Sequence, residues 1–460
     1  MTLSRKFAEF AAGLRYDSIP REVIEIARLR LLDTVGVCLA STGMDYARAA
    51  LDTVLDQGGR PESTLYGAAP KTNAAWAAFY NGALAHGNDY DDTHPVAIMH
   101  VSGVIVPTML ALGERLRTPG PAALAAAVAG YEIGIRIGMG APTEFHARGF
   151  HPTSVCGVFS AAVTASHLLG LDAACTAHAL GIAGSQAAGS MEFLADGAWT
   201  KRMHPGWAAH AGVIAAQLAA RGYTGPAAVL EGRYGLYRAY AGAQPPSAER
   251  LCANLGREWE VLNVDFKPYP CGHISHPYMD CARDLRDRHG LKAFDIAEIE
   301  LRVPPAAVPI LCEPLADKLR PASAYAARFS LPYAVAVILV LGRAGIDEFS
   351  EARIRDPEIL ALAARCRYEI DTTLPFPGAF PGWIRIRLND GRLLESRRDT
   401  SRGSRQTPMS ADELYEKFEA NVNRAMPAGA ARRLWDAGLA FETLASVEPF
   451  TRLLAGHEQS

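Results

Sequence analysis

The sequence lacks the cysteine spacings and the charge runs by which several classes of protein can be recognised directly. Its 8 cysteines in 460 residues form no C-x-x-C pair and have no regular spacing, which excludes a disulfide scaffold. The 46 basic and 49 acidic residues nearly cancel, and no run of five like charges occurs. We therefore expect no nucleic-acid partner, because such a protein needs a markedly basic surface. The 41 glycines and 29 prolines follow no period, which excludes a collagen-like or disordered chain.

Long apolar runs and cofactor motifs are absent as well. No uninterrupted apolar stretch reaches the ~18 residues of a membrane-spanning helix, and charged residues interrupt the start of the chain. We expect no membrane partner, no secretory signal and a cytoplasmic location. Dinucleotide, Walker A, nucleophile-elbow, zinc and EF-hand motifs are all missing. The sequence therefore predicts chemistry by side chains alone, with no cofactor and no metal.

Apolar residues recur at helical spacing through the first half of the chain. Many of these runs are rich in alanine and glycine, whose small side chains let helices approach closely. A polar residue and an early proline, in Ser18-Ile-Pro20, mark the start of the first run. The expected helices are about 18–38, 72–86, 102–117, 121–139, 153–169, 172–187, 207–222 and 246–255.

The pattern changes after about residue 261. Residues 297–303 alternate apolar and charged side chains, which predicts a strand with one wet face. Residues 384–396 alternate in the same way around Asn389-Asp-Gly391, which predicts a hairpin. An apolar helix is expected between these strands, at about 326–341. Ser410-Ala-Asp-Glu413 is a capping-box pattern, after which the chain returns to helices.

This order predicts a predominantly helical α+β fold. We expect a large all-α domain built from residues 1–262 and 401–460, with a smaller α+β domain of residues 263–400 inserted between them.

Eleven of the thirteen histidines lie between His86 and His276. The densest group is His86-Gly-Asn-Asp-Tyr-Asp-Asp-Thr93, which His100 follows. Three carboxylates within four residues repel one another unless cations or donors hold them, so an ordinary surface loop rarely keeps them. A catalytic site is one interpretation of this group. A helix end, capped by the second or third aspartate, is the other.

Gly149-Phe-His151-Pro-Thr-Ser154 places a histidine before the start of an apolar helix. Amides and hydroxyls at a helix N-terminus suit a carboxylate ligand. Thr153 or Ser154 could equally cap its own helix, with no ligand involved.

A cationic group lies further along the chain, where Lys201, Arg202, His204 and His210 fall within ten residues. Such a group can clamp carboxylates, and a desolvated lysine can serve as a general base. The alternative is a solvated basic edge.

Lys267-Pro-Tyr-Pro-Cys271 leads into two histidines, His273 and His276, at the expected join of the domains. The prolines and Pro277 predict a rigid turn, and a rigid histidine pair at a domain join is a reasonable site. A single histidine, by contrast, is more often structural.

Taken together, these stretches resemble the MmgE/PrpD family, and the similarity covers nearly the whole chain. Any one of its markers is weak, but all of them in order are specific. The markers are Leu31-Leu-Asp-Thr-Val-Gly36, His86 to Thr93, Gly149 to Thr153, Lys201-Arg-Met-His204 through His210, Lys267 to His276, and Arg328-Phe-Ser-Leu-Pro-Tyr333.

The resemblance implies a helical domain from both chain ends, an inserted α+β domain, a homodimer, no cofactor, and a site in the cleft between the domains. The matching residues are Asp89, Thr93, His100, His151, Lys201, His276 and Tyr333. We expect Asp89, His100, His151, Lys201 and His276 to be catalytic, and Thr93, His204, His273 and Tyr333 to bind the substrate.

The resemblance also implies proton transfer next to a carboxylate of a small di- or tricarboxylate. Lys201 with His151 and His276 would then bind and polarise the carboxylates, and Asp89 with His100 would orient or perform the proton transfer. We expect a hydro-lyase similar to 2-methylcitrate dehydratases first. Decarboxylation of the cis-aconitate type and epimerisation of the iminodisuccinate type stay open. A helical binding protein without catalysis is the alternative from another class.

Overall fold

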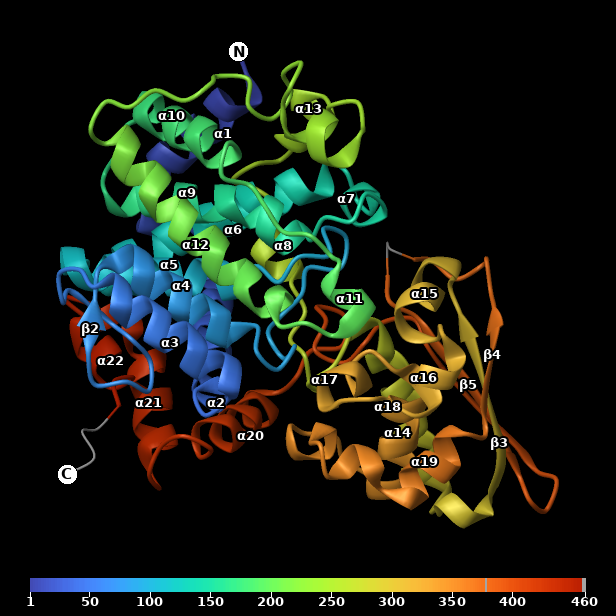
Figure 1. Ribbon diagram of the computed structural model, residues 1–460. Helices are drawn as coiled ribbons and strands as arrows, with labels where there is room; N and C mark the ends of the chain where they lie inside the picture. The colour runs from blue at the N-terminus through green and yellow to red at the C-terminus, as the bar shows by residue number, and fades with distance from the viewer. Residues whose placement is uncertain (377–378, 457–460) are drawn as a thin grey trace. The chain divides into compact units, whose positions relative to one another are not determined.

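The contacts within the chain divide it into two structural units (Figure 1). The structure is a computed structural model and describes residues 1–376 and 379–456. By their contacts, Asn88–Tyr90 belong to unit 2, although the chain on either side of them belongs to unit 1. Unit 1 comprises Met1–Gly87, Asp91–Val264 and the chain from Ser410 onward, and unit 2 comprises Asn88–Tyr90 and Asp265–Met409.

Long helices with small side chains form the core of unit 1. At the crossing of two of them, a Cβ added to Gly206 would lie 2.1 Å from the carbonyl oxygen of Phe79, and one added to Gly82 would lie 2.7 Å from Gly206 Cα. Larger residues would force these helices apart, so the glycines set the spacing. The core helices are α4 (Ala74–Ala85), α5 (Ser102–Leu116), α6 (Gly120–Met139), α9 (Gly157–Leu168) and α12 (Thr200–Ala219).

Helix α2 (Arg21–Ser41) connects this core to the C-terminal part of the chain. It packs against α4 and against α20 (Ala411–Val422), where the buried Lys417 Nζ lies 2.7 Å from Asp33 Oδ1. The other elements of unit 1 are α1 (Leu3–Gly13), α3 (Asp45–Gln57), β1 (Ser63–Thr64), β2 (Lys71–Thr72), α7 (Glu144–Ala147), α8 (Pro152–Val155), α10 (Ala173–Gly184), α11 (Phe193–Asp196), α13 (Ala248–Leu251), α21 (Ala430–Leu439) and α22 (Glu448–Arg452).

Helix α6 is long and apolar enough to cross a membrane, by length and composition alone. It is nevertheless a core helix, because 89% of its most apolar window is buried inside the structure. It also carries a fully buried carboxyl group, Glu132, which accepts the Val261 N–H at 3.3 Å. Arg136, one turn later, approaches the same carboxyl group at 3.5 Å.

Glu132 makes the stability of the protein depend on pH. Burial raises its pKa from 4.5 to about 8, with Arg136 acting in the opposite direction. The folded state therefore binds a proton that the unfolded state has lost, so stability should fall as pH rises from about 5 to 8. We expect Glu132→Gln to reduce this fall by up to about 1.4 kcal/mol per pH unit. Urea unfolding at several pH values measures the difference. Glu25→Gln, at an exposed position, is the matched control. If the free energy of unfolding changed equally with pH in the wild type and in both variants, Glu132 would not be the group responsible.

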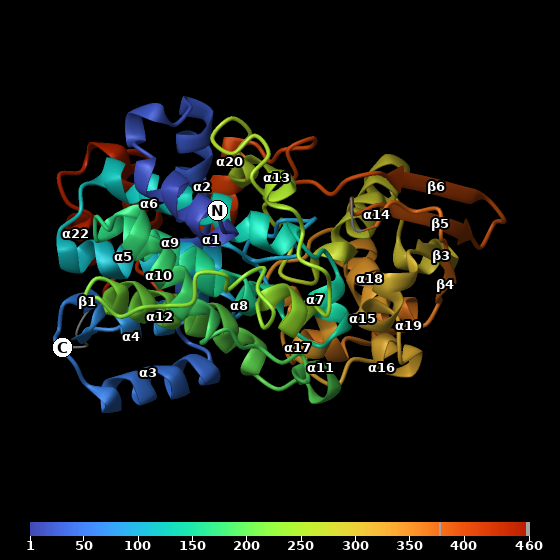
Figure 2. The same ribbon diagram turned by 90° about the horizontal axis from the view of Figure 1, so that it is seen from above.

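Unit 2 contains a four-stranded sheet in the order β4-β3-β5-β6. β3 (Ile296–Val303) pairs antiparallel with β5 (Gly382–Leu388) and parallel with β4 (Cys366–Ile370), and β5 pairs antiparallel with β6 (Leu393–Arg398). Helix α14 (His276–His289) packs on β5 and β6, and α18 (Leu331–Leu341) packs on α14 (Figure 2). The other helices are α15 (Val308–Leu311), α16 (Leu315–Leu319), α17 (Ala324–Ala327) and α19 (Pro357–Ala363).

Charged side chains alternate with the buried ones along these strands. Arg385 on β5 lies 3.3 Å from Glu300 on β3 and 3.2 Å from Glu395 on β6. Arg387 lies 2.8 Å from Glu298 in the same way. The alternation in the sequence therefore separates a core face from a face of cross-strand ion pairs.

The expected fold class, a predominantly helical α+β protein, is confirmed. The single helix expected at 326–341 is wrong: the chain forms α17 and α18, because the Ser330 side chain caps a new helix through the Tyr333 N–H. Helix α12 begins at Thr200 and not near 207, with Pro205 inside it. The domain boundaries expected at 262/263 and 400/401 stay predictions.

Candidate active site

The aspartate-rich loop after α4 is buried and internally paired. Helix α4 ends next to His86, and the chain turns back so that both Asp91 carboxylate oxygens lie 2.8–2.9 Å from His86 Nδ1. Both side chains are fully buried, which a carboxylate tolerates only with such partners. The carboxylate therefore fixes the orientation of the His86 ring and the proton on its Nδ1.

Asp92 holds the other end of this loop. Its carboxylate lies 3.2 Å from the buried Arg30 Nη1 and accepts the N–H of Ser102, the first residue of α5, at 3.3 Å. The Ser102 hydroxyl contacts both Asp92 and Tyr131. Burial raises the pKa of Asp92, and the charge of Arg30 opposes that rise. Asp92 thus ties the loop to the first turn of α5, although the cap residue of that helix is Val101 and not an aspartate.

His100 is anchored from three sides. Its Nδ1 lies 2.9 Å from the carbonyl oxygen of Asp92, 3.2 Å from Thr93 Oγ1 and 3.6 Å from Asp91 Oδ1. Its backbone N–H donates to Thr153 Oγ1 at 3.0 Å. The expectation that Thr153 caps its own helix is therefore wrong: His151 is at the cap position of α8 without a side-chain cap, and Thr153 joins that helix to His100.

His151 and the first turns of α12 supply the cationic side of the site. His151 Nδ1 lies 3.0 Å from His204 Nδ1, so one ring donates and the other accepts. Burial lowers the pKa of both histidines, to about 4 for His204, and the charge of Lys201 lowers both further. The same two causes lower the pKa of His146 to about 4. These imidazoles are therefore neutral at pH 7.

Lys201 and Arg202 are both buried, so the alternative of a solvated basic edge is wrong. Arg202 has a structural contact, because its Nε donates to the Gly87 carbonyl at 3.1 Å and its guanidinium lies 4.8 Å from the Tyr46 ring centre. Lys201 is the cation whose charge acts on the neighbouring histidines. The charge of a surface lysine would be screened by the solvent, whereas Lys201 is buried and its charge is screened much less.

The histidine rings of unit 1 form one cluster. Ring centres are 4.5 Å apart for His86 and His100, 5.6 Å for His86 and His151, and 5.9 Å for His100 and His151. His204 adds a fourth ring, 5.2 Å from His151. A buried cation beside neutral imidazoles can bind a carboxylate and accept a proton from the carbon next to it.

Unit 2 holds Asp89 with a buried lysine. Lys267 is fully buried, and its Nζ lies 2.9 Å from the Asp89 carbonyl oxygen and 3.4 Å from Asp89 Oδ1. Asp89 has a positive φ of 50°, an uncommon conformation for a residue other than glycine. Arg328 binds the preceding residue, Asn88, through its carbonyl at 2.9 Å and its side-chain oxygen at 3.1 Å. Two cations thus fix this short segment within unit 2.

The two histidines expected in a rigid turn are also buried in unit 2. Residues His273–Ser275 form a 3-10 turn, and α14 begins at His276 with a proline next. His276 Nε2 lies 3.2 Å from the Cys271 carbonyl, and burial, then His273 and Lys267, lowers its pKa well below the usual value. His273 Nε2 lies 2.9 Å from Ser401 Oγ, and the two rings are 4.8 Å apart.

Tyr333 lies in the apolar core of unit 2. Its hydroxyl donates to the Glu348 carbonyl at 2.8 Å, and its ring packs against Phe349. Burial raises its pKa. These contacts give Tyr333 a structural role, and the geometry adds no support for the substrate-binding role expected of it.

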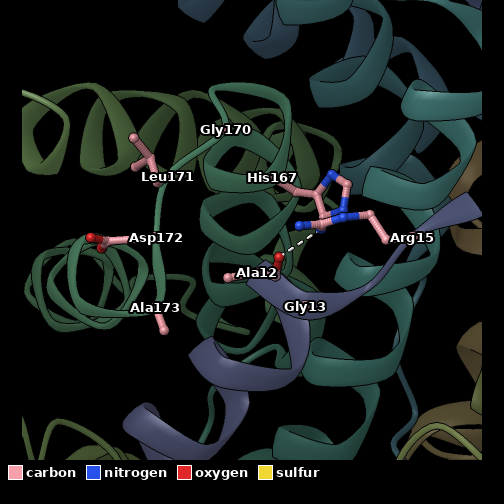
Figure 3. A pocket seen from close by; sticks show the side chains of 8 residues that line it. All are labelled: Ala12, Gly13, Arg15, His167, Gly170, Leu171, Asp172 and Ala173. Carbon is pink, nitrogen blue, oxygen red and sulfur yellow. Dashed lines mark hydrogen bonds between the residues drawn. The ribbon is translucent and has the colours of Figure 1, made fainter.

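A surface hollow of about 550 Å³ lies elsewhere in unit 1, between the end of α1 and the turn from α9 to α10 (Figure 3). Its polar groups already have partners in the chain. Arg15 donates to the carbonyls of Ala12 and Leu14, and His167 Nε2 lies 3.0 Å from Leu14 O. Asp172 caps α10. Nothing in this hollow requires a ligand, so we place no site here.

The structure gathers the predicted site residues into two sets. Thr93, His100, His151, Lys201 and His204 lie together in unit 1, and Asp89, His273 and His276 lie in unit 2. That both sets act on one substrate stays a prediction. Buried residues that hold these side chains, or the loop that carries them, were not recognised in the sequence as part of the site, although the dense loop motif contains two of them. They are Arg30, His86, Asp91, Lys267 and Arg328.

Known proteins and family models are similar to this chain over most of its length. The MmgE/PrpD N-terminal domain matches residues 5–249, and the MmgE/PrpD C-terminal domain matches residues 269–443. A cis-aconitate decarboxylase of Homo sapiens is 30% identical over 99% of this chain and 95% of its own length. One from Aspergillus terreus is 25% identical (98% and 96%), and a 2-methylcitrate dehydratase of Cupriavidus necator is 27% identical (91% and 88%). The chain is an enzyme of the MmgE/PrpD family.

Proposed function

We propose that this protein is a lyase that acts on a small di- or tricarboxylate through side chains alone. The observation that carries the proposal is the buried cluster of unit 1, in which the charge of Lys201 acts on neutral imidazoles of His151 and His204. A polycarboxylate needs a cation for its charge, and breaking a bond beside a carboxylate needs a base and preorganised donors. The cluster offers both.

The hydrogen bonds of the cluster assign the nitrogen that accepts the proton. A carbonyl oxygen can only accept, so His100 Nδ1 must donate its hydrogen to the Asp92 carbonyl. When the His100 ring carries only this hydrogen, its lone pair is on Nε2. The carboxylate of Asp91 imposes the same tautomer on His86. We assign proton transfer to Nε2 of His100, with His151 as its neighbour in the cluster and Lys201 as the carboxylate-binding cation.

Asp89 and His276 of unit 2 remain part of the proposal as further catalytic residues, with His273 and Thr93 as substrate-binding residues. Lys267 positions Asp89 through both its carbonyl and its carboxylate. His276 Nδ1 has no hydrogen-bond partner among the described residues, so a substrate oxygen or proton could engage it.

Decarboxylation of cis-aconitate is the reaction to test first. Relatives named cis-aconitate decarboxylase match 98–99% of the chain. This similarity supports testing decarboxylation before dehydration, which was the first expectation from the sequence. In decarboxylation, a carboxylate leaves as carbon dioxide, its bonding electron pair stays on the substrate, and a proton that Nε2 of His100 has taken up from water is delivered to the substrate carbon. In dehydration, the base removes a proton and a hydroxyl group leaves as water. Epimerisation returns a proton to the opposite face.

Proton NMR in deuterated water distinguishes these reactions. The panel consists of cis-aconitate, 2-methylcitrate, citrate and an iminodisuccinate-like compound. New terminal vinyl signals from cis-aconitate, with release of carbon dioxide, are the expected result. A methyl signal that moves to the position of a vinylic methyl group would indicate dehydration of 2-methylcitrate. Deuterium uptake without net product would indicate epimerisation. Calorimetric binding of these compounds without any turnover would overturn the proposal and favour a binding protein.

We also propose that the enzyme is a homodimer located in the cytoplasm. Light scattering coupled to size-exclusion chromatography tests the dimer, and a mass near 49.3 kDa, that of one chain, would contradict it.

A further inference from the structure

One short segment of unit 1 packs on the histidine pair of the candidate site. Residues 190–198, which we call the strap, lie between α10 and α12 and include α11. The centre of the Phe193 ring lies 6.4 Å from that of His151 and 5.9 Å from that of His204, edge-on to both rings. Both histidines are only 3% exposed. A substrate therefore reaches these rings only when a group that covers them moves.

Phe193 fastens the strap to the rest of unit 1. Among the strap residues, all of which the structure describes, Phe193 alone is buried, at 4% exposed, whereas the next residue, Leu194, is 45% exposed. The backbone hydrogen bond from the Gly197 N–H to the Phe193 carbonyl lies within the strap, so it does not hold the strap against its neighbours. A segment with so few buried contacts opens at a much lower free energy than a core helix.

The two ends of the strap are built differently. At its start, a β-bridge joins Ser190 to Phe150, and the His151 N–H donates to the Gly189 carbonyl at 2.9 Å. Near its end, Gly197 has a φ of 75°, which favours glycine. A Cβ added there would meet no atom within 4 Å, so this position needs glycine for its conformation and not for space. The strap is thus tied to the backbone of His151 at one end and can bend at the other.

We propose that the strap is a gate over the histidine cluster of unit 1 and that Phe193 is the side chain that closes it. In the closed state, the Phe193 ring shields His151 and His204 from water. Bending at Gly197 would withdraw the ring and admit a small anion. The value of the gate for the reaction rests on the proposed function, because excluding water strengthens the interaction between a substrate carboxylate and the Lys201 cation.

Labelling with diethyl pyrocarbonate at pH 7 measures the opening without any substrate. The reagent modifies neutral imidazoles, and mass spectrometry of the digested full-length protein gives a separate rate for each histidine. Phe193→Ala should raise the rates at His151 and His204 about 10- to 100-fold, because burial of a phenylalanine side chain favours the closed state by a factor of that order. Unchanged rates at both histidines would overturn the gate.

Two comparisons separate local opening from a loss of overall stability. Leu194→Ala removes an exposed side chain from the same short helix and should leave the rates at His151 and His204 unchanged. His210, further along α12, packs on two tryptophan rings and should react at the same rate in Phe193→Ala and the wild type. An equal increase at His210 would show that Phe193 only stabilises the fold, and would also overturn the gate.

The bend is tested with Gly197→Ala. A left-handed conformation disfavours alanine, so the closed state should lose population and the rates at His151 and His204 should rise about 5- to 30-fold. Gly170→Ala is the matched control, because Gly170 also has a positive φ, of 66°, and open space around an added Cβ, but lies in the turn after α9. If Gly197→Ala reacts like the wild type, the bend at this residue is wrong.

Protection by ligands separates the gate from the proposed function. Citrate and cis-aconitate should slow the labelling of His151 and His204 in the wild type. If Phe193→Ala accelerates the labelling but no compound of the NMR panel protects either histidine, the gate stands and the proposed function fails. If these compounds protect the histidines and Phe193→Ala has no effect, the gate fails and the proposed function stands.

Discussion

Replacing Lys201 with alanine is expected to lower turnover by about 100-fold or more, with little loss of stability. Removing one preorganised group that stabilises developing charge typically has an effect of that size. Lys201 is buried in the first turn of α12, and its charge acts on His146, His151 and His204. Initial rates with cis-aconitate, or with the compound that the NMR panel identifies, measure the effect.

Two further lysine variants make this test specific. Lys201→Arg keeps the positive charge but changes the shape and the donor geometry, so its activity should lie between those of Lys201→Ala and the wild type. Lys292→Ala removes an exposed lysine of unit 2 and should leave turnover unchanged. Activity of Lys201→Ala within a few-fold of the wild type would show that Lys201 is outside the catalytic machinery.

The sequence predicted the helices of unit 1 well, because their apolar and small residues recur along long segments. The start of α12 was the exception. The helix was expected to begin near residue 207, after Lys201, whereas Lys201 lies in its first turn. Pro205 was placed before the helix, whereas the structure has it at the sixth helical position. Proline is expected in the first turn of a helix and costs a hydrogen bond beyond it, so the pattern favoured a later start.

Strand β4 was not predicted at all, for a different reason. Cys366–Ile370 alternates apolar and polar residues, but only over five positions directly after α19. Its parallel pairing with β3 links residues more than 60 positions apart, which a local pattern cannot reveal. The hairpin of β5 and β6 was predicted because its turn and both its strands are adjacent in the sequence.

The same difference between local patterns and distant pairings applies to the candidate site. Chemistry-bearing residue types in dense motifs, such as His100 and Lys201, could be selected from the sequence. The groups that orient them could not, because partners such as Arg30 and Asp92 are 62 positions apart and only the fold pairs them. Asp91 was visible in the motif, but the sequence alone did not tell which of its aspartates would face a histidine.

Replacing Arg30 with alanine is expected to destabilise the protein by about 3–5 kcal/mol, because it leaves the Asp92 carboxylate buried without its cation. The guanidinium is also fully buried and donates from Nε to the Val261 carbonyl at 3.2 Å, with a further contact to the Val264 carbonyl. These two acceptors lose their donor at the same time. Urea unfolding at pH 7 measures the loss.

An exposed pair and a double variant complete this experiment. Arg432→Ala breaks a solvent-exposed pair with Asp436 on α21 and should cost less than about 1 kcal/mol. Arg30→Ala combined with Asp92→Asn should cost less than the sum of the single variants, with a coupling of about 0.5–3 kcal/mol, because no charge is then left buried alone. Additive losses, or an Arg30→Ala loss below 1 kcal/mol, would contradict the pairing. His100 donates to the backbone carbonyl of Asp92, so a loop that loses this ion pair should also lose turnover.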